Sequence, residues 1–182
     1  MLSAGERTIG TFVLALDAAP RAIEIPAEKF QEYLLEERLV DMLMWRAGKG
    51  QEDAPGRERY SRNLKAILQI GPKLDDLAMK QLGQELEIVP LQHPYSVMPG
   101  GALQLMVLFQ GKPLPGRAVM AANRYRSHIA TKTIRTDSRG TVTFPMQRTG
   151  DWMFRLVHME PATGDVDFRS YWASLTFSLP DR

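Results

Sequence analysis

Apolar and polar residues alternate one by one along much of the second half of this chain. In the longest run, Tyr171, Ala173, Leu175, Phe177 and Leu179 alternate with more polar neighbours. Because successive side chains of a β-strand point to opposite faces, a period of two predicts strands with one buried face. Turn signals such as Pro99, Gly100 and Gly101 separate the runs. The pattern predicts seven strands, near residues 86–91, 102–110, 117–124, 128–135, 141–146, 151–159 and 170–179.

Seven short strands with frequent turns are typical of a β-sandwich. We therefore expect residues 85–182 to form an antiparallel sandwich domain of the immunoglobulin or transthyretin-like kind. One face of the strands should supply its core, made of Leu103, Leu105, Val107, Phe109, Phe144, Trp152, Phe154, Leu175 and Phe177.

Residues 1–84 have a different pattern, which predicts an N-terminal region of one or two strands followed by helices. Residues 11–25 predict strand structure that is broken at Ala19 and Pro20. Pro26 suits the first position of a helix, and apolar residues recur at helical spacing after it. Residues 57–70 predict a second helix, or a helix that passes into a strand. The expected fold class is therefore α+β.

Composition excludes several classes of function. The chain has 182 residues, no cysteine and a formal net charge of only +2. The absence of cysteine removes disulfides, thiolate metal sites and thiol nucleophiles, and so small a charge argues against nucleic acid as a partner. Its apolar runs are too short to span a membrane. The first ten residues lack the pattern of a signal peptide, so we expect no export signal on this chain.

Catalytic patterns are also missing from the sequence. There is no G-x-S-x-G turn, and the three histidines follow no recognisable triad order. We therefore expect the protein not to be an enzyme.

One histidine is a candidate metal ligand. His158 continues the apolar face of the strand near residues 151–159, and an acidic loop with Glu160, Asp165 and Asp167 follows it, of which we expect the two aspartates to be the oxygen ligands. Imidazole and carboxylate together suit nickel, cobalt or zinc. The alternative is a partly buried histidine that is hydrogen-bonded to the backbone.

Two polar clusters have both structural and functional interpretations. Arg57, Glu58, Tyr60, Arg62 and Lys65 form the denser one. On a helix, Glu58 and Arg62 would form an ion pair at a helical surface; alternatively, the cluster is a polar seam that fastens the helical region to the sandwich.

The second polar cluster is basic. Arg124, Arg126, His128 and Lys132 fall on one face of a predicted strand pair. Such a face could follow phosphates, but charge that protects a sheet edge explains it better.

A longer series of residues carries a family resemblance. The series comprises residues 25–30, 33–34, 57–62 with Lys65, 86–91, 94–95, 111–114, 136–137 with Gly140, 150–152, 157–159 and 171–177. In this order the stretches resemble a bacterial domain-of-unknown-function family that is described as a periplasmic component of cobalt or nickel uptake systems.

The resemblance implies a periplasmic location, a membrane transporter or receptor component as partner, and nickel or cobalt as the bound ion. It also implies that residues 1–84 are the remnant of a larger first domain. The family tends to have glycine where Arg38 stands, so we expect the first helix to continue through this position.

Three functional hypotheses remain. The first is a non-enzymatic binding or accessory module, with a role in nickel or cobalt uptake. The second is a structural or protein-interaction domain without a small ligand, because a fold alone does not determine function. The third is a carbohydrate-binding sandwich, which predicts exposed aromatic side chains and directs attention to Trp45 and Trp172.

Overall fold

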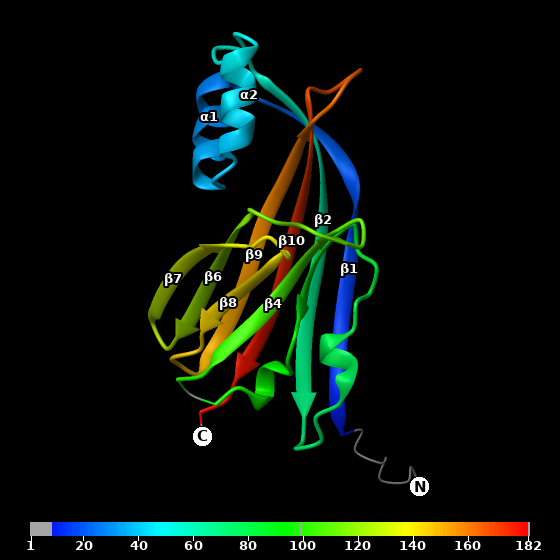
Figure 1. Ribbon diagram of the computed structural model, residues 1–182, viewed down its shortest axis with the longest axis vertical. Helices are drawn as coiled ribbons and strands as arrows, with labels where there is room; N and C mark the ends of the chain where they lie inside the picture. The colour runs from blue at the N-terminus through cyan, green and yellow to red at the C-terminus, as the bar shows by residue number, and fades with distance from the viewer. Residues whose placement is uncertain (1–8, 99, 182) are drawn as a thin grey trace, which may run out of the picture.

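The computed structural model describes residues 9–98 and 100–181 of the chain, and it is mostly β (Figure 1). The first eight residues and Pro99 of a predicted turn lie outside this description. The described residues form two short helices, α1 (Ala27–Glu36) and α2 (Val40–Gly48), and ten strands. The strands are β1 (Gly10–Ile25), β2 (Gly56–Ile70), β3 (Leu86–Pro90), β4 (Ala102–Phe109), β5 (Lys112–Pro113), β6 (Ala118–Tyr125), β7 (His128–Arg135), β8 (Thr141–Pro145), β9 (Gly150–Pro161) and β10 (Phe168–Leu179).

The strands form two sheets. The larger sheet has the order β1-β2-β10-β9-β6-β7, and the smaller one has the order β3-β4-β5 with β8 paired to β4. All neighbours are antiparallel except β2 and β10, which run parallel. Because β2 pairs with β10, the two halves of the chain share one sheet. The predicted boundary between residues 84 and 85 therefore does not separate two sheets.

The main core lies between the two sheets. Phe154 is fully buried at its centre, and its ring centroid lies 5.2 Å from that of Phe144 and 5.9 Å from that of Phe177. The other predicted core residues are buried too, except Phe109, which is partly buried at the margin. All seven segments that the alternation predicted as strands are strands.

Residues 57–70 are not helical, so this part of the prediction is wrong. They form β2, whose inward-facing residues Ser61, Asn63 and Lys65 are polar but buried. Inward-facing polar residues conceal the period of two, because the usual contrast between apolar and polar faces is lost. The expected helical ion pair between Glu58 and Arg62 is therefore absent, since residues four apart in a strand are separated by roughly 13 Å.

The helices form a hairpin that connects β1 to β2 at one end of the molecule (Figure 1). The expected single helix instead breaks between Glu36 and Val40, where Arg38 has a left-handed backbone with φ of 60°. β1 is one continuous strand, and the break predicted at Ala19 and Pro20 is a bulge in its pairing with β2.

A second, smaller core fixes the hairpin to the outer face of the larger sheet. Phe30 and Leu34 of α1 pack with Leu39 and Met42 against Val157, Met159 and Phe168. Two ion pairs reinforce this contact, because Arg155 binds both carboxylate oxygens of Glu37 and Arg117 binds Asp41. Neither helix, nor any other in the described part of the chain, has the length and apolar character needed to cross a membrane.

Candidate functional site

Strand β2 divides the predicted polar cluster between two faces of the larger sheet. Glu58, Tyr60 and Arg62 alternate on the outer face, whereas Lys65 faces the space between the sheets. Arg57 lies at the start of the strand and binds Asp167. The five residues therefore form three separate arrangements.

The outer-face residues line a small pocket, which we call the aromatic pocket. Its volume is about 200 Å³, and its walls are Ile23, Ile25, Tyr33, Glu58, Tyr60, Arg62 and Trp172. β1 supplies the two isoleucines, α1 supplies Tyr33, β2 supplies the polar residues and β10 supplies Trp172. The pocket therefore lies where the helical hairpin meets the sheet.

Glu58 is the buried acid of the aromatic pocket, and only 2% of its surface is exposed. Its Oε1 accepts hydrogen bonds from the hydroxyls of Ser170 and Tyr33, the latter at 3.3 Å. None of the cationic side chains within the described residues forms an ion pair with it. Burial raises the pKa of the Glu58 carboxyl, and burial together with the Glu58 charge raises the pKa of Tyr33. A carboxylate in such surroundings gains strongly from a cationic partner.

Aromatic and cationic side chains form the rest of the pocket. The rings of Tyr33 and Trp172 stack with centroids 5.7 Å apart and an interplanar angle of 7°. The guanidinium carbon of Arg62 lies 5.3 Å from the ring centre of Tyr60 and 5.7 Å from that of Trp172. Such contacts are favourable cation–π interactions.

The two tryptophans that the carbohydrate hypothesis selected are both partly covered. Trp172 is half-buried by its stack with Tyr33, and its indole nitrogen donates a hydrogen bond to Ser170. Trp45, on α2, packs edge-on against Phe168. Neither ring is a free, flat platform of the kind on which a sugar stacks.

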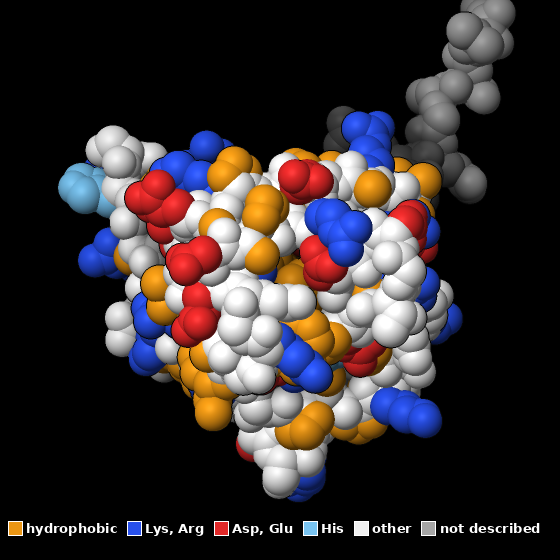
Figure 2. All heavy atoms as spheres, turned by 90° about the horizontal axis from the view of Figure 1, so that it is seen from above, with side chains coloured by type: hydrophobic (Ala, Val, Ile, Leu, Met, Phe, Trp, Pro, Cys, Tyr) orange, Lys and Arg blue, Asp and Glu red, His pale blue; other side chains and the backbone are white. Residues whose placement is uncertain are grey.

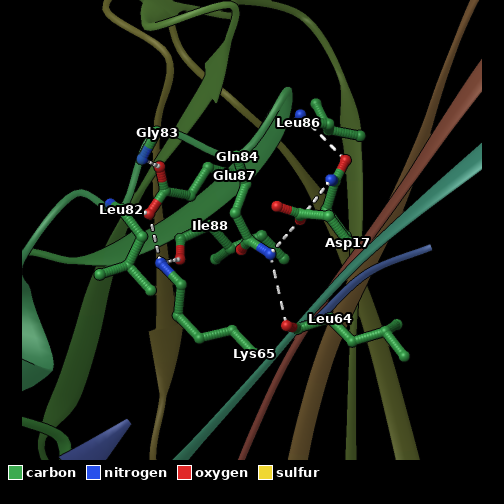
Figure 3. A network of polar contacts seen from close by, with 10 residues as sticks. Asp17, Leu64, Lys65, Leu82, Gly83, Gln84, Leu86, Glu87 and Ile88 are labelled. Carbon is green, nitrogen blue, oxygen red and sulfur yellow. Dashed lines mark hydrogen bonds and ion pairs between the residues drawn. The ribbon is translucent and has the colours of Figure 1, made fainter. Parts of the chain in front are cut away.

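Lys65 takes part in a buried polar network between the sheets (Figure 3). Its Nζ lies 2.5 Å from Oε1 of Glu87 on β3 and also donates to the carbonyl of Ile88. Glu87 accepts two further hydrogen bonds, from the backbone N–H groups of Leu82 and Gly83. Burial lowers the pKa of Lys65, and the adjacent Glu87 opposes this shift. The two charges are paired with each other, and the network joins the two sheets.

The candidate metal ligands lie in separate arrangements. Asp167 accepts two hydrogen bonds from the side chain of Arg57 and one from its backbone, and Asp165 pairs with Arg59 at 2.5 Å. Within the described ranges, no group of three or more His, Cys, Asp or Glu side chains could hold a metal ion. The metal site therefore stays a prediction.

His158 is buried at the end of β9, on the core side as expected. Its ring packs edge-on against Phe109, with centroids 4.4 Å apart, and its Nε2 lies 3.4 Å from Oε1 of Glu160. Nδ1 is buried without a hydrogen-bond partner. Burial and the charge of Arg117 lower the pKa of His158, which favours the neutral imidazole that metal coordination requires. Its carboxylate partner is Glu160, which belongs to the acidic loop seen in the sequence but was not chosen there as a ligand.

The predicted basic face is split by the strand register. Arg124 pairs with Ile129, whereas Lys132 pairs with Ala121, so the two cations lie on opposite faces of the sheet. Arg124 is also bound to Asp151. β7 is the outermost strand of its sheet, which is the edge position expected for protective charge.

At the helical end of the molecule, acidic, basic and apolar side chains are interspersed on the surface (Figure 2).

Comparison with known proteins provides one family relationship. Neither the curated proteins nor the solved structures gave a match. A family model described as a domain of unknown function (DUF4198) matches residues 3–160. This match covers most of the chain, including the helical hairpin and β2, and the chain therefore belongs to this domain-of-unknown-function family.

Proposed function

We propose that this protein is a non-enzymatic binding or accessory module and that the aromatic pocket is its ligand site. The observation that carries the proposal is Glu58, a buried carboxylate without a cationic partner that lines the pocket. Burying an unpaired charge destabilises a fold, so such a group favours a ligand that supplies the missing charge. Aromatic side chains around it provide apolar contact area.

We further propose that the two packed sheets are a sandwich of the immunoglobulin or transthyretin-like kind. The family resemblance supports a periplasmic location and a membrane transporter or receptor component as the partner. It also supports a role in nickel or cobalt uptake. In this role the metal ion would bind at His158 and not in the aromatic pocket.

The binding proposal is tested with a panel of small amines, carboxylates, amino acids and sugars. We expect at least one class to raise the melting temperature of the wild type and to have a smaller effect on Glu58→Gln, which keeps the shape of the side chain without its charge. Asp165→Asn is the matched control, because Asp165 is exposed and lies outside the pocket. If every class acts equally on wild type and Glu58→Gln, the pocket is not the ligand site.

A second candidate function is a structural or protein-interaction domain without a small ligand. The hydrogen bond from Tyr33 to Glu58 favours it, because this contact joins α1 to the sheet as a polar seam would. Under this alternative, Glu58→Gln changes stability but no member of the panel binds.

The metal hypothesis needs its own titration. Nickel, cobalt and zinc are titrated calorimetrically into the wild type and into His158→Ala. If His158 is a ligand, binding is weak, since one imidazole and one carboxylate are fewer protein ligands than tight sites use. It should also be absent from the variant. Equal heats from both proteins would exclude His158.

A further inference from the structure

This inference deepens the proposed function and depends on it, and it concerns two opposite charges in the aromatic pocket. Glu58 has no cationic partner, and Arg62 likewise forms no ion pair within the described part of the chain. Two other arginines of the same strand do form ion pairs, Arg57 with Asp167 and Arg59 with Asp165. The pocket therefore contains one unpaired charge of each sign.

The two charges do not neutralise each other across the pocket. Glu58 and Arg62 face the same side of β2, with Tyr60 between them, and their Cα atoms are roughly 13 Å apart at the usual rise of a strand. Arg62 instead lies over the rings of Tyr60 and Trp172. A ligand that satisfies both residues must carry a cationic group and an anionic group at separate positions.

Ligands of other charge types fit this arrangement less well. A simple cation would gain from Glu58 but be repelled by Arg62, and a simple anion would have the opposite difficulty. A metal ion would find one carboxylate among aromatic walls, which is too few ligands. A neutral sugar carries no charge and would leave both Glu58 and Arg62 without an ionic partner.

We infer that the aromatic pocket binds a small zwitterion with an amine and a carboxylate. The ammonium group donates hydrogen bonds to Glu58, the carboxylate accepts them from Arg62, and the body of the ligand packs against Tyr60 and Trp172. Because the guanidinium is planar and has several donors, it can bind a carboxylate through two hydrogen bonds. The pocket volume of about 200 Å³ suits a ligand of about the size of a single amino acid.

Two matched series of probes test the inference by calorimetry. The first is L-phenylalanine with phenethylamine, which lacks the carboxylate, and 3-phenylpropanoate, which lacks the ammonium group. The second is 6-aminohexanoate, whose charges are further apart, with hexylamine and hexanoate. We expect one of the zwitterions to bind at least about tenfold more tightly than either of its truncated analogues, since each loses a charged hydrogen bond.

Two variants assign each end of the ligand. Glu58→Gln should remove the advantage of the zwitterion over the carboxylate analogue but keep its advantage over the amine. Arg62→Gln should have the reverse effect. Arg59→Gln is the matched control, because Arg59 lies on the same strand outside the pocket. Far-ultraviolet circular dichroism establishes that each variant is folded.

Three outcomes would overturn the inference. If an amine binds as tightly as its zwitterion, the pocket is a cation site. If only sugars or anions bind in a manner that depends on Glu58, this inference fails while the binding proposal stands. If the zwitterions bind equally to wild type and to both pocket variants, they do not bind in this pocket. If, in addition, no other compound depends on Glu58, both proposals fail.

Discussion

At the residue scale, His93 lies in a buried chain of hydrogen bonds that fixes its protonation state. The hydroxyl of Thr11 donates to Oε1 of Gln69 at 2.8 Å, so it must accept from Nε2 of His93 at 2.9 Å. Nδ1 of His93 accepts the backbone N–H of Tyr95. These two contacts require a neutral imidazole that carries its proton on Nε2. Burial lowers the pKa of His93, and Asp75 and Asp76 oppose this shift.

This arrangement predicts that the protein loses stability in mild acid. The folded state holds His93 neutral, whereas the unfolded chain takes up a proton below about pH 6.5. Because the unfolded state binds more protons, the free energy of unfolding falls as the pH drops through 6.5 toward the lower folded pKa. The contribution of one histidine is at most about 1.4 kcal/mol per pH unit.

Urea unfolding of the wild type and His93→Gln at pH 7.5, 6.5 and 5.5 measures this effect. We expect the variant to depend less steeply on pH. His158 has a lowered pKa as well and accounts for part of the remaining slope, while the raised pKa of Glu58 opposes it. Both are common to the two proteins, so they cancel in the difference. Equal slopes would show that His93 protonates freely in the fold.

At the element scale, the helical hairpin depends on a glycine at the start of β2. A Cβ atom added at Gly56 would lie 2.4 Å from Cγ of Phe30, whose ring is fully buried. The ring and the backbone are therefore in direct contact, and this contact seats α1 on the sheet. Real Cβ atoms do not approach other atoms so closely, so any side chain here must displace the ring.

We predict that Gly56→Ala destabilises the protein by about 1–3 kcal/mol, the usual result of overpacking. Amide hydrogen exchange should become faster in α1 and α2, while the sheets stay protected. Gly48→Ala is the control, because an added Cβ would have no atom within 4 Å of it. At the end of a helix this alanine should be neutral or stabilising by up to about 1 kcal/mol. Unchanged exchange in Gly56→Ala would contradict the predicted contact.

The elements also explain which parts of the fold the sequence could predict. Strands β4, β9 and β10 place apolar side chains on one face, and their alternation was sufficient to locate them. β2 was mistaken for a helix because its inner face carries Asn63 and Lys65, whose partners lie on other strands. The helix break at Arg38 has no local signal either, since arginine rarely adopts a left-handed backbone.

The candidate site was predicted only in pieces. Glu58, Tyr60 and Arg62 were recognised as a polar cluster and Trp172 as an aromatic residue to inspect. Their meeting depends on the parallel pairing of β2 with β10, which joins residues more than a hundred positions apart. Tyr33 reaches them from α1 and belonged only to the family resemblance. Local patterns contain no information about such long-range pairings.

At the scale of the whole molecule, the two sheets are joined by apolar packing and by a buried ion pair. Lys65 on β2 and Glu87 on β3 have side chains only 2% and 1% exposed. Asn63 supports the same junction, because its side chain donates to Asp17 on β1 and accepts the backbone N–H of Leu86. The polar residues that obscured β2 in the sequence therefore fix the position of one sheet on the other.

The last prediction concerns this pair. Lys65→Met should destabilise the protein by about 3–5 kcal/mol, because it leaves the Glu87 charge buried without its cation. The double variant Lys65→Met/Glu87→Gln removes both charges and keeps an acceptor oxygen for one of the two N–H groups, of Leu82 or Gly83, whose hydrogen bonds Glu87 accepts. We expect it to be more stable than Lys65→Met alone. Lys80→Met, at an exposed lysine, should change stability by no more than about 0.5 kcal/mol. Urea unfolding of these four proteins and of the single variant Glu87→Gln measures the coupling, and strictly additive losses would mean that the pair does not act as a unit.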